Sequence, residues 1–309
     1  MALRGIKPSS IQKRLKCLFF GAAGVGKTTA AIQFPAPYVI DTEKGAENAQ
    51  YCKMIEDQGG AIFQTSDYDE VFKEVRALLV EKHPYKTLVI DPLTVIYNDL
   101  LDKFSENPKL MTHGRHYQEV NKLMKRLLSM ILRLDMNVII TSHAKNEYGE
   151  KMEVKGQTFD CYKKLDHIFD LGFEIKIENG ARVAKIIKSR VEGFPSNQFI
   201  PFSYEEIAKR YGRQAVEKET VPESLATKEQ LMEFTHLSKA VKLPEDVVEK
   251  WLSKAGVDHA EDMNRDVMQK CIDFMKNKIT KEDLPEAVVE RAAAYYRKQS
   301  EMALDGDVH

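Results

Sequence analysis

Residues 21–28 read Gly-Ala-Ala-Gly-Val-Gly-Lys-Thr and match the pattern G-x-x-x-x-G-K-[ST] at every fixed position. An apolar run, LKCLFF at 15–20, precedes this stretch as an expected strand, and residues 29–34 are expected to begin a helix. A strand, a glycine-rich loop and a helix in this order are the context in which the pattern binds phosphate. The glycines let successive N–H groups point inward, which makes an anion nest at a helix N-terminus. The stretch therefore predicts a nucleoside triphosphate site.

Within this site, Lys27 is expected to reach the β- and γ-phosphates, and the Thr28 hydroxyl is expected to bind Mg²⁺. A second apolar stretch, TLVID at 87–91, ends in an acid about sixty residues downstream. This is the Walker B pattern, which predicts that Asp91 holds magnesium through water. The expected cofactors are thus ATP and Mg²⁺. The expected nucleotide-binding residues are Gly21, Ala22, Ala23, Gly24, Val25, Gly26, Lys27, Thr28 and Thr29.

The rest of the first two thirds of the chain alternates short apolar runs with amphipathic stretches. Residues 171–178 and 181–189 alternate apolar and polar side chains around Asn179-Gly180, which predicts a hairpin with a type I′ turn. This order predicts an α/β fold with a mostly parallel sheet, helices on both faces and a final antiparallel hairpin. Residues 98–116 break the apolar periodicity and are expected to form a mobile insertion. Further strands are expected at 38–40, 61–64, 87–91 and 138–141, and helices at 47–58, 68–82 and 117–134.

The composition is that of a globular chain, with 43% hydrophobic and 30% charged residues among 309. No run approaches the roughly 20 apolar residues of a membrane span, and the first residues lack the apolar segment of a secretory signal. The four cysteines form no C-x-x-C pair, which predicts free thiols in a reducing cytoplasm. They are Cys17, Cys52, Cys161 and Cys271.

Charge is unevenly distributed along the chain. Residues 217–309 carry 20 acidic and 14 basic residues, a net of −6, so the total of −1 leaves +5 for residues 1–216. We expect an ATP-binding core at 1–216, a linker at 217–226 and an all-α module at 227–309. This module is interpreted as a partner-binding unit or as a stabilising cap. Its helices are expected at 228–241, 245–255, 265–278 and 286–302.

The first 17 residues are basic and contain no acid. We expect them to form a solvated arm that leads into the first strand, or an arm that touches phosphate or docks a second copy. The basic residues are Arg4, Lys7, Lys13, Arg14 and Lys16.

Four segments carry a family resemblance. VIDTE at 39–43 resembles the IDTE or IDAE strand end of recombinases, and LVIDPLTV at 88–95 resembles their Walker B strand. Residues 138–143 resemble their strand that ends in Asn-Gln, and 182–202 their segment with two cations two residues apart. In this order they resemble the RecA family over about residues 15–205. More narrowly, they resemble the phage RecA-like single-strand annealing proteins of the Sak type.

The resemblance implies roles for five residues. Glu43 would polarise the attacking water, and a carboxylate there can accept its proton. His143 stands where recombinases carry a γ-phosphate-sensing Gln, so sensing is expected to be weaker or pH-dependent. Lys188 and Arg190 would reach a neighbour's ATP across an assembly interface. Tyr51 would cover the adenine, with one extra residue in the spacing, or would be a core-facing helix residue.

The resemblance implies a slow, DNA-stimulated ATPase that assembles on single-stranded DNA, with ATP between protomers, and promotes annealing or strand pairing. Residues 103–116 and 145–164 are the expected DNA loops because lysines and aromatic residues alternate there. Either segment is equally well interpreted as a solvated loop.

Two other functions fit the same sequence. A hexameric helicase or translocase would share every ATP residue, and a nucleotide-gated regulator would act through the helical module. For that module the expected partners are a single-strand-binding protein or a recombination nuclease. The expected location is the cytoplasm, which is the host cytoplasm if the chain is phage-encoded.

Overall fold

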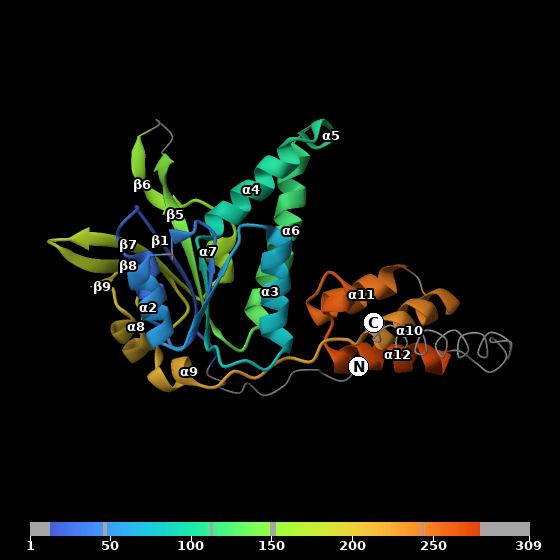
Figure 1. The fold of residues 1–309 in the computed structure, drawn as a ribbon. Coiled ribbons are helices and arrows are strands. Elements are labelled where there is room, and N and C mark those ends of the chain that lie inside the picture. Colours follow the sequence, from blue (N-terminus) through green and yellow to red (C-terminus); the bar gives the residue numbers. More distant parts are fainter. Residues whose placement is uncertain are drawn as a thin grey trace, which may run out of the picture. The chain divides into compact units, whose positions relative to one another are not determined.

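The computed structural model describes residues 13–45, 48–111, 114–148, 153–241, 243 and 245–278 (Figure 1). The chain divides into two compact units, Met1–Glu223 and Ser224–His309. The division falls inside the segment 217–226 whose composition predicts a linker.

The first unit is built on one sheet, whose described strands run in the order β3-β2-β4-β5-β1-β7-β8-β9, with β6 paired to β5. The pairs among β1, β2, β3, β4, β5 and β7 are parallel, whereas β8, β9 and β6 pair antiparallel. The strands are β1 Lys16–Gly21, β2 Pro37–Asp41, β3 Ala61–Gln64, β4 Thr87–Asp91, β5 Asn137–Tyr148, β6 Val154–Phe159, β7 Leu171–Glu178, β8 Ala181–Ser189 and β9 Phe199–Pro201.

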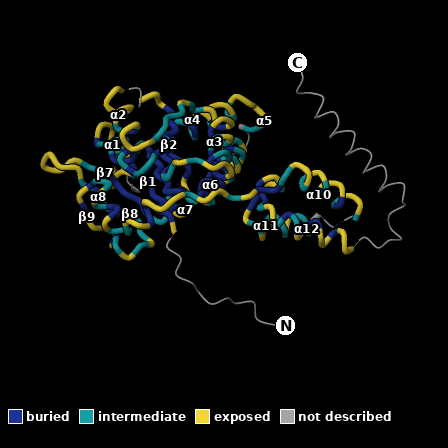
Figure 2. Tube along the Cα trace, turned by 60° about the horizontal axis from the view of Figure 1, so that its bottom comes forward, coloured by how far each residue is buried: buried dark blue, intermediate teal, exposed yellow. Residues whose placement is uncertain are grey.

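Helices cover both faces of this sheet. On one face, Cys17 and Phe19 of β1 belong to a buried cluster with residues of α1, α2 and α8. On the other face, α4 and α3 each pack against α6 (Figure 1). Figure 2 shows that the central strands β1 and β2 are mostly buried. The helices are α1 Lys27–Ala31, α2 Ala49–Asp57, α3 Tyr68–Val80, α4 Leu93–Ser105, α5 Pro108–Met111, α6 Arg115–Arg133, α7 Leu165–Ile168, α8 Tyr204–Tyr211 and α9 Arg213–Glu217.

The predicted fold class is confirmed, since the sheet is mostly parallel, is flanked by helices and ends in an antiparallel hairpin. This is the architecture expected of a RecA-like P-loop core. The turn at Asn179-Gly180 has φ of 51° and 77°. Positive φ at both positions is the type I′ geometry that the dipeptide predicts.

Two segments differ from the prediction. The expected insertion at 98–116 is largely helical, because α4 continues to Ser105 and α6 begins at Arg115. Helix α4 buries Leu93, Ile96 and Leu100 at helical spacing, and only residues 112–113 lie outside the described chain. The expected loop at 145–164 begins as a β-hairpin of β5 and β6. Most of β6 is exposed, so no apolar alternation marked it as a strand.

The expectation of a solvated basic arm is wrong for Arg14 and Lys16, which are both buried. Arg14 pairs with Asp135 at 3.2 Å and donates to the carbonyl of Glu219 at 2.6 Å. Lys16 donates to the carbonyl of Leu134 at the end of α6. Arg4 and Lys7 lie outside the described residues.

The second unit contains α10 Lys228–Ala240, α11 Glu245–Ala255, the short 3-10 helix η3 Ala260–Asp262 and α12 Arg265–Lys278. Thr227 caps α10 in a reciprocal capping box with Gln230. A small core that includes Phe234 and Met268 holds the helices together, and Trp251 packs against it. The helix expected at 286–302 lies outside the described residues.

Within the described chain, no helix is both long enough and apolar enough to cross a membrane. The four cysteines are free thiols, as expected from their spacing.

Candidate functional site

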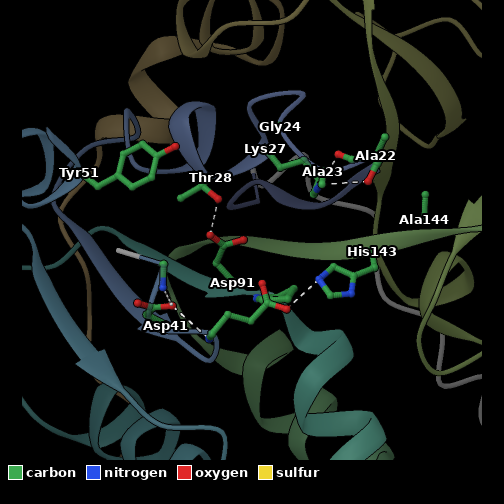
Figure 3. Close-up of a pocket in the computed structure, with 14 residues that line it drawn as sticks. Ala22, Ala23, Gly24, Lys27, Thr28, Asp41, Tyr51, Asp91, His143 and Ala144 are labelled. Atoms are coloured by element: carbon green, nitrogen blue, oxygen red, sulfur yellow. Dashed lines mark hydrogen bonds and ion pairs between the residues drawn. The ribbon is translucent and has the colours of Figure 1, made fainter. Parts of the chain in front are cut away.

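The loop between β1 and α1 is shaped by its glycines. Gly24 and Gly26 have φ of 76° and 94°, a region that side chains with a Cβ rarely adopt. Gly26 is also the N-cap of α1, so the N–H groups of the first turn face the loop. A pocket of about 450 Å³ opens here (Figure 3). Its lining consists of Gly21, Ala22, Ala23, Gly24, Lys27, Thr28, Asp41, Glu43, Gly45, Tyr51, Asp91, Pro92, His143 and Ala144.

Lys27 folds back over the loop that precedes it. Its Nζ donates to the carbonyls of Gly21 at 2.9 Å and Ala22 at 2.8 Å. Burial lowers the pKa of Lys27, while the charges of Asp91 and Glu43 oppose this shift. An ammonium held by two carbonyls of a phosphate-binding loop can exchange them for phosphate oxygens at little structural cost.

Asp91 ends β4 and faces the loop across β5. Its Oδ2 accepts from the Thr28 hydroxyl at 2.6 Å, and its Oδ1 accepts from the Thr141 hydroxyl. Burial raises the pKa of the Asp91 carboxyl, and the two donated hydrogen bonds oppose this shift. Sequence reasoning missed Thr141. The strand order would have identified it: β5 lies between β1 and β4, so the end of β5 is next to both the phosphate-binding loop and Asp91.

These groups fit a magnesium nucleotide. No cluster of three or more His, Cys, Asp or Glu side chains suited to a metal occurs among the described residues. Mg²⁺ prefers one or two protein oxygens together with water and substrate phosphates. The adjacent oxygens of Thr28 and Asp91 supply that limited set, and magnesium bound there would stabilise negative charge on the phosphates.

Glu43 and His143 both line the pocket and contact each other. Glu43 Oε1 lies 2.9 Å from His143 Nε2, and the two side chains are 46% and 45% exposed (Figure 3). Asp41 shapes the turn before Glu43 by accepting from the backbone N–H groups of Glu43 and Gly45, each at 3.2 Å. The His143 backbone N–H donates to Thr94 Oγ1 at 3.0 Å. The proposed base and the proposed sensor are thus partners of each other.

Tyr51 contacts both the pocket and the core. The residue lines the pocket, and its ring also packs against the buried cluster on that face of the sheet. Its hydroxyl lies 3.5 Å from Thr29 Oγ1.

Lys188 and Arg190 lie away from this pocket. Lys188 pairs with Gly172 of β7, and Gly172 pairs with Leu18, three residues before β1 ends. The register shift in β8 falls at Ile187, before Lys188, and the pairing with β7 continues regularly through Ser189 to the Arg190 N–H, which donates to the carbonyl of Asp170 at 2.9 Å. Lys188 donates to the carbonyl of Asp166, and Arg190 to that of His167 at 2.9 Å.

A glycine-shaped phosphate loop, a hydroxyl–carboxylate pair and a nearby acid define a P-loop ATPase. Residues 13–193 match the family model described as AAA domain, and the chain belongs to this family.

Solved structures with similar folds include the RadB recombinase. It has a TM-score of 0.40 and 18% identity over 62% of this chain and 88% of that chain. The assembled ATPase EscN of the type III secretion system of enteropathogenic E. coli has a TM-score of 0.38 and 12% identity. That match covers 86% of this chain and 67% of EscN. Similarity at this level says nothing about activity. No curated protein matches the chain.

Proposed function

We propose that this P-loop ATPase assembles on single-stranded DNA and promotes annealing or strand pairing. The observation that carries the proposal is the continuity of β5. This strand bears Thr141 and His143 at the nucleotide pocket and then continues to Tyr148 in the hairpin with β6. Hence one strand joins the ATP site to an exposed extension of the sheet.

The hairpin offers the groups that a DNA backbone requires. Lys145 and Lys155 are exposed on its two strands, and Lys163 and Lys164 follow β6. Lys145 pairs with Asp160 at 2.9 Å, so it is held on the hairpin surface. Exposed lysines bind phosphates without regard to sequence, as an annealing protein requires.

For hydrolysis, we propose an exchange of partners within the pocket. Lys27 leaves the carbonyls of Gly21 and Ala22 for the phosphates. Glu43 leaves His143 and accepts the proton of the attacking water, a role for which its exposed carboxylate is suited. The released His143 can then donate to the γ-phosphate. Since His143 begins the segment that enters the hairpin, DNA bound there would alter this exchange.

Assembly would supply the remaining cations. Lys188 lies level with Leu18, whereas the phosphate-binding loop begins only after the end of β1. Lys188 and Arg190 are therefore too far from the loop to contact the nucleotide of their own molecule. We propose that they reach the ATP of a neighbouring copy after leaving the carbonyls of Asp166 and His167. If so, Lys188→Ala and Glu43→Gln proteins, each inactive alone, should regain ATPase activity when mixed. Full activity of the Lys188→Ala, Arg190→Ala double variant would exclude the shared site.

The test of the DNA role is the rate of ATP hydrolysis with and without single-stranded DNA. We expect DNA to raise the rate, and we expect Lys155→Glu to weaken DNA binding and reduce this stimulation. Lys109→Glu is the matched control, because Lys109 is also exposed but lies in α5, within the other predicted DNA segment. If only Lys109→Glu lost the stimulation by DNA, the DNA-binding surface would lie in the α4–α6 region instead.

The alternatives differ in measurable ways. Unwinding of duplex DNA would identify a helicase, and ATP binding without any response to DNA would identify a regulator. For the second unit we propose a protein partner, with a single-strand-binding protein or recombination nuclease as the class to test first.

A further inference from the structure

Arg182 of β8 stands beside the phosphate-binding loop, and none of the roles above uses it. The register of the hairpin pairs Arg182 with Ile177 of β7. Strand β7 runs parallel to β1, with Glu174 beside Phe20. Because Ile177 lies three residues further along β7 than Glu174, Arg182 is carried beyond the carboxyl end of β1. The phosphate-binding loop begins at this end of β1, so Arg182 lies next to it.

The Arg182 side chain lies directly against Gly26. A Cβ added to Gly26 would come within 2.5 Å of Arg182 Nε and within 2.9 Å of its Cδ and Cζ. The absence of a side chain at Gly26 therefore lets the guanidinium approach the loop backbone. An anion held by the N–H groups of that loop would lie within reach of this cation.

The guanidinium also lacks a partner within the described part of the chain. Arg182 is exposed, and its side chain makes no hydrogen bond or ion pair with another described residue. Other arginines of the core contrast with it, since Arg210 pairs with Glu206 and Arg213 with Glu205 and Glu217. A planar guanidinium with free donors matches the geometry of phosphate oxygens.

The sheet order sets the side from which Arg182 approaches. Strands β5 and β4 lie on one flank of β1 and bring Asp91, whereas β7 and β8 lie on the other flank and bring Arg182. A phosphate chain held by the loop would therefore have Asp91 on one flank and Arg182 on the other. We infer that Arg182 binds the phosphate chain from the β7 flank, in the same molecule whose loop holds the nucleotide. The inference rests on the proposed binding of ATP at the loop.

The test is calorimetric titration of the full chain, without DNA, using a non-hydrolysable ATP analogue with Mg²⁺ and, separately, inorganic tripolyphosphate. Loss of a charge-assisted contact should weaken the binding of both ligands to Arg182→Ala by about 10- to 100-fold. Arg182→Lys should restore part of the affinity because it keeps the charge. Lys185→Ala is the matched control, since it removes a cation three residues along the same strand.

Each other outcome overturns the inference in a distinct way. Weaker binding of the ATP analogue alone would assign Arg182 to the nucleoside. Unchanged binding of both ligands, with weaker binding of single-stranded DNA, would assign it to the DNA surface. An equal loss in Lys185→Ala would mean that the hairpin acts only through its total charge. Failure of the unsubstituted protein to bind either ligand would overturn the proposed function as well.

Discussion

The two ends of β1 each have a lysine that binds backbone carbonyls, and the two lysines serve different purposes. Lys16, the first residue of the strand, donates to Ile131, Leu134 and Met136 at 3.3, 2.8 and 2.9 Å. Lys27, beyond the other end, donates to two carbonyls of its own loop. Burial lowers the pKa of both, and that of Lys16 to about 7.

The difference lies in the space beside each ammonium group. Lys16 is 7% exposed, and its acceptors are the last carbonyls of α6 and the segment that follows. Lys27 borders a pocket of about 450 Å³. The same hydrogen-bond chemistry is therefore structural where no ligand can enter and functional where one can. The substitutions that follow test this division.

The largest effect is expected from Lys27→Ala. This change removes the cation that would bind the phosphates and stabilise the transition state, so tight ATP binding and turnover should both be lost. The fold should persist, because both hydrogen bonds of the Lys27 ammonium are to its own loop. Calorimetric titration with Mg-ATP and thermal unfolding without nucleotide measure the two effects. Unchanged affinity and turnover would show that this loop is not the ATP-binding site.

Glu43→Gln should keep ATP binding and lower hydrolysis by about 10²- to 10⁴-fold, the usual contribution of a positioned base. The amide can still contact His143 but cannot accept the proton of water. Titration with ATP measures the effect on binding, and the single-turnover rate of hydrolysis measures the effect on the chemical step. Asp41→Asn is the comparison, since Asp41 binds backbone N–H groups in the turn. Loss of hydrolysis in Asp41→Asn but not in Glu43→Gln would reverse their roles.

Lys16→Met should destabilise the first unit by about 2–4 kcal/mol while leaving the ATP pocket intact. It fills a similar volume but leaves buried carbonyls at the end of α6 without their donor, and each such group costs about 1–3 kcal/mol. Denaturant unfolding measures the change. A more stable variant would show that desolvation of the ammonium outweighs its hydrogen bonds.

The same variant should change the pH dependence of stability. The pKa of Lys16 is about 7 in the folded chain and near 10.5 when exposed, so the unfolded chain binds this proton more tightly. The free energy of unfolding of the unsubstituted protein should therefore rise, relative to Lys16→Met, as pH increases from 7 to 10. The slope is at most about 1.4 kcal/mol per pH unit. Parallel pH profiles would contradict a depressed pKa.

The smallest effect on the pocket is expected from removing residues 227–309. Every residue that lines the pocket lies in the first unit, so affinity for Mg-ATP should change by less than about twofold. Loss of binding or of folding in the 1–226 fragment would make the second unit a structural cap. Retained binding with a lost protein partner would make it a docking module.

Local patterns predicted the parts of the fold that depend on neighbouring residues. Strands β3 and β4, the turn at Asn179-Gly180 and helix α12 agree with their predicted bounds. Each combines a regular apolar period with a residue that ends it. The phosphate loop could be predicted for the same reason, because all its glycines lie within eight consecutive residues, 21–28.

Features that depend on distant partners could not be predicted. Arg14 and Lys16 look like surface residues in a basic stretch, and only Asp135 and the end of α6 make them buried. Arg182 and Thr141 become part of the site through strand order, which a sequence period does not contain. The bulge at Ile187 in β8 likewise arises from the pairing of β8 with β7, and nothing in the sequence marks it.

Strand β5 contains two regions that differ in their pairing. Residues 138–140 pair with β1 on one side and β4 on the other, whereas 144–148 pair only with β6. Amide hydrogen exchange should therefore be slowest in the first region and fast in the second, with the step near His143. A ligand that holds the hairpin would slow exchange on one side of this step, and a nucleotide would slow it on the other. Exchange rates along one strand can thus report which of the two sites is filled.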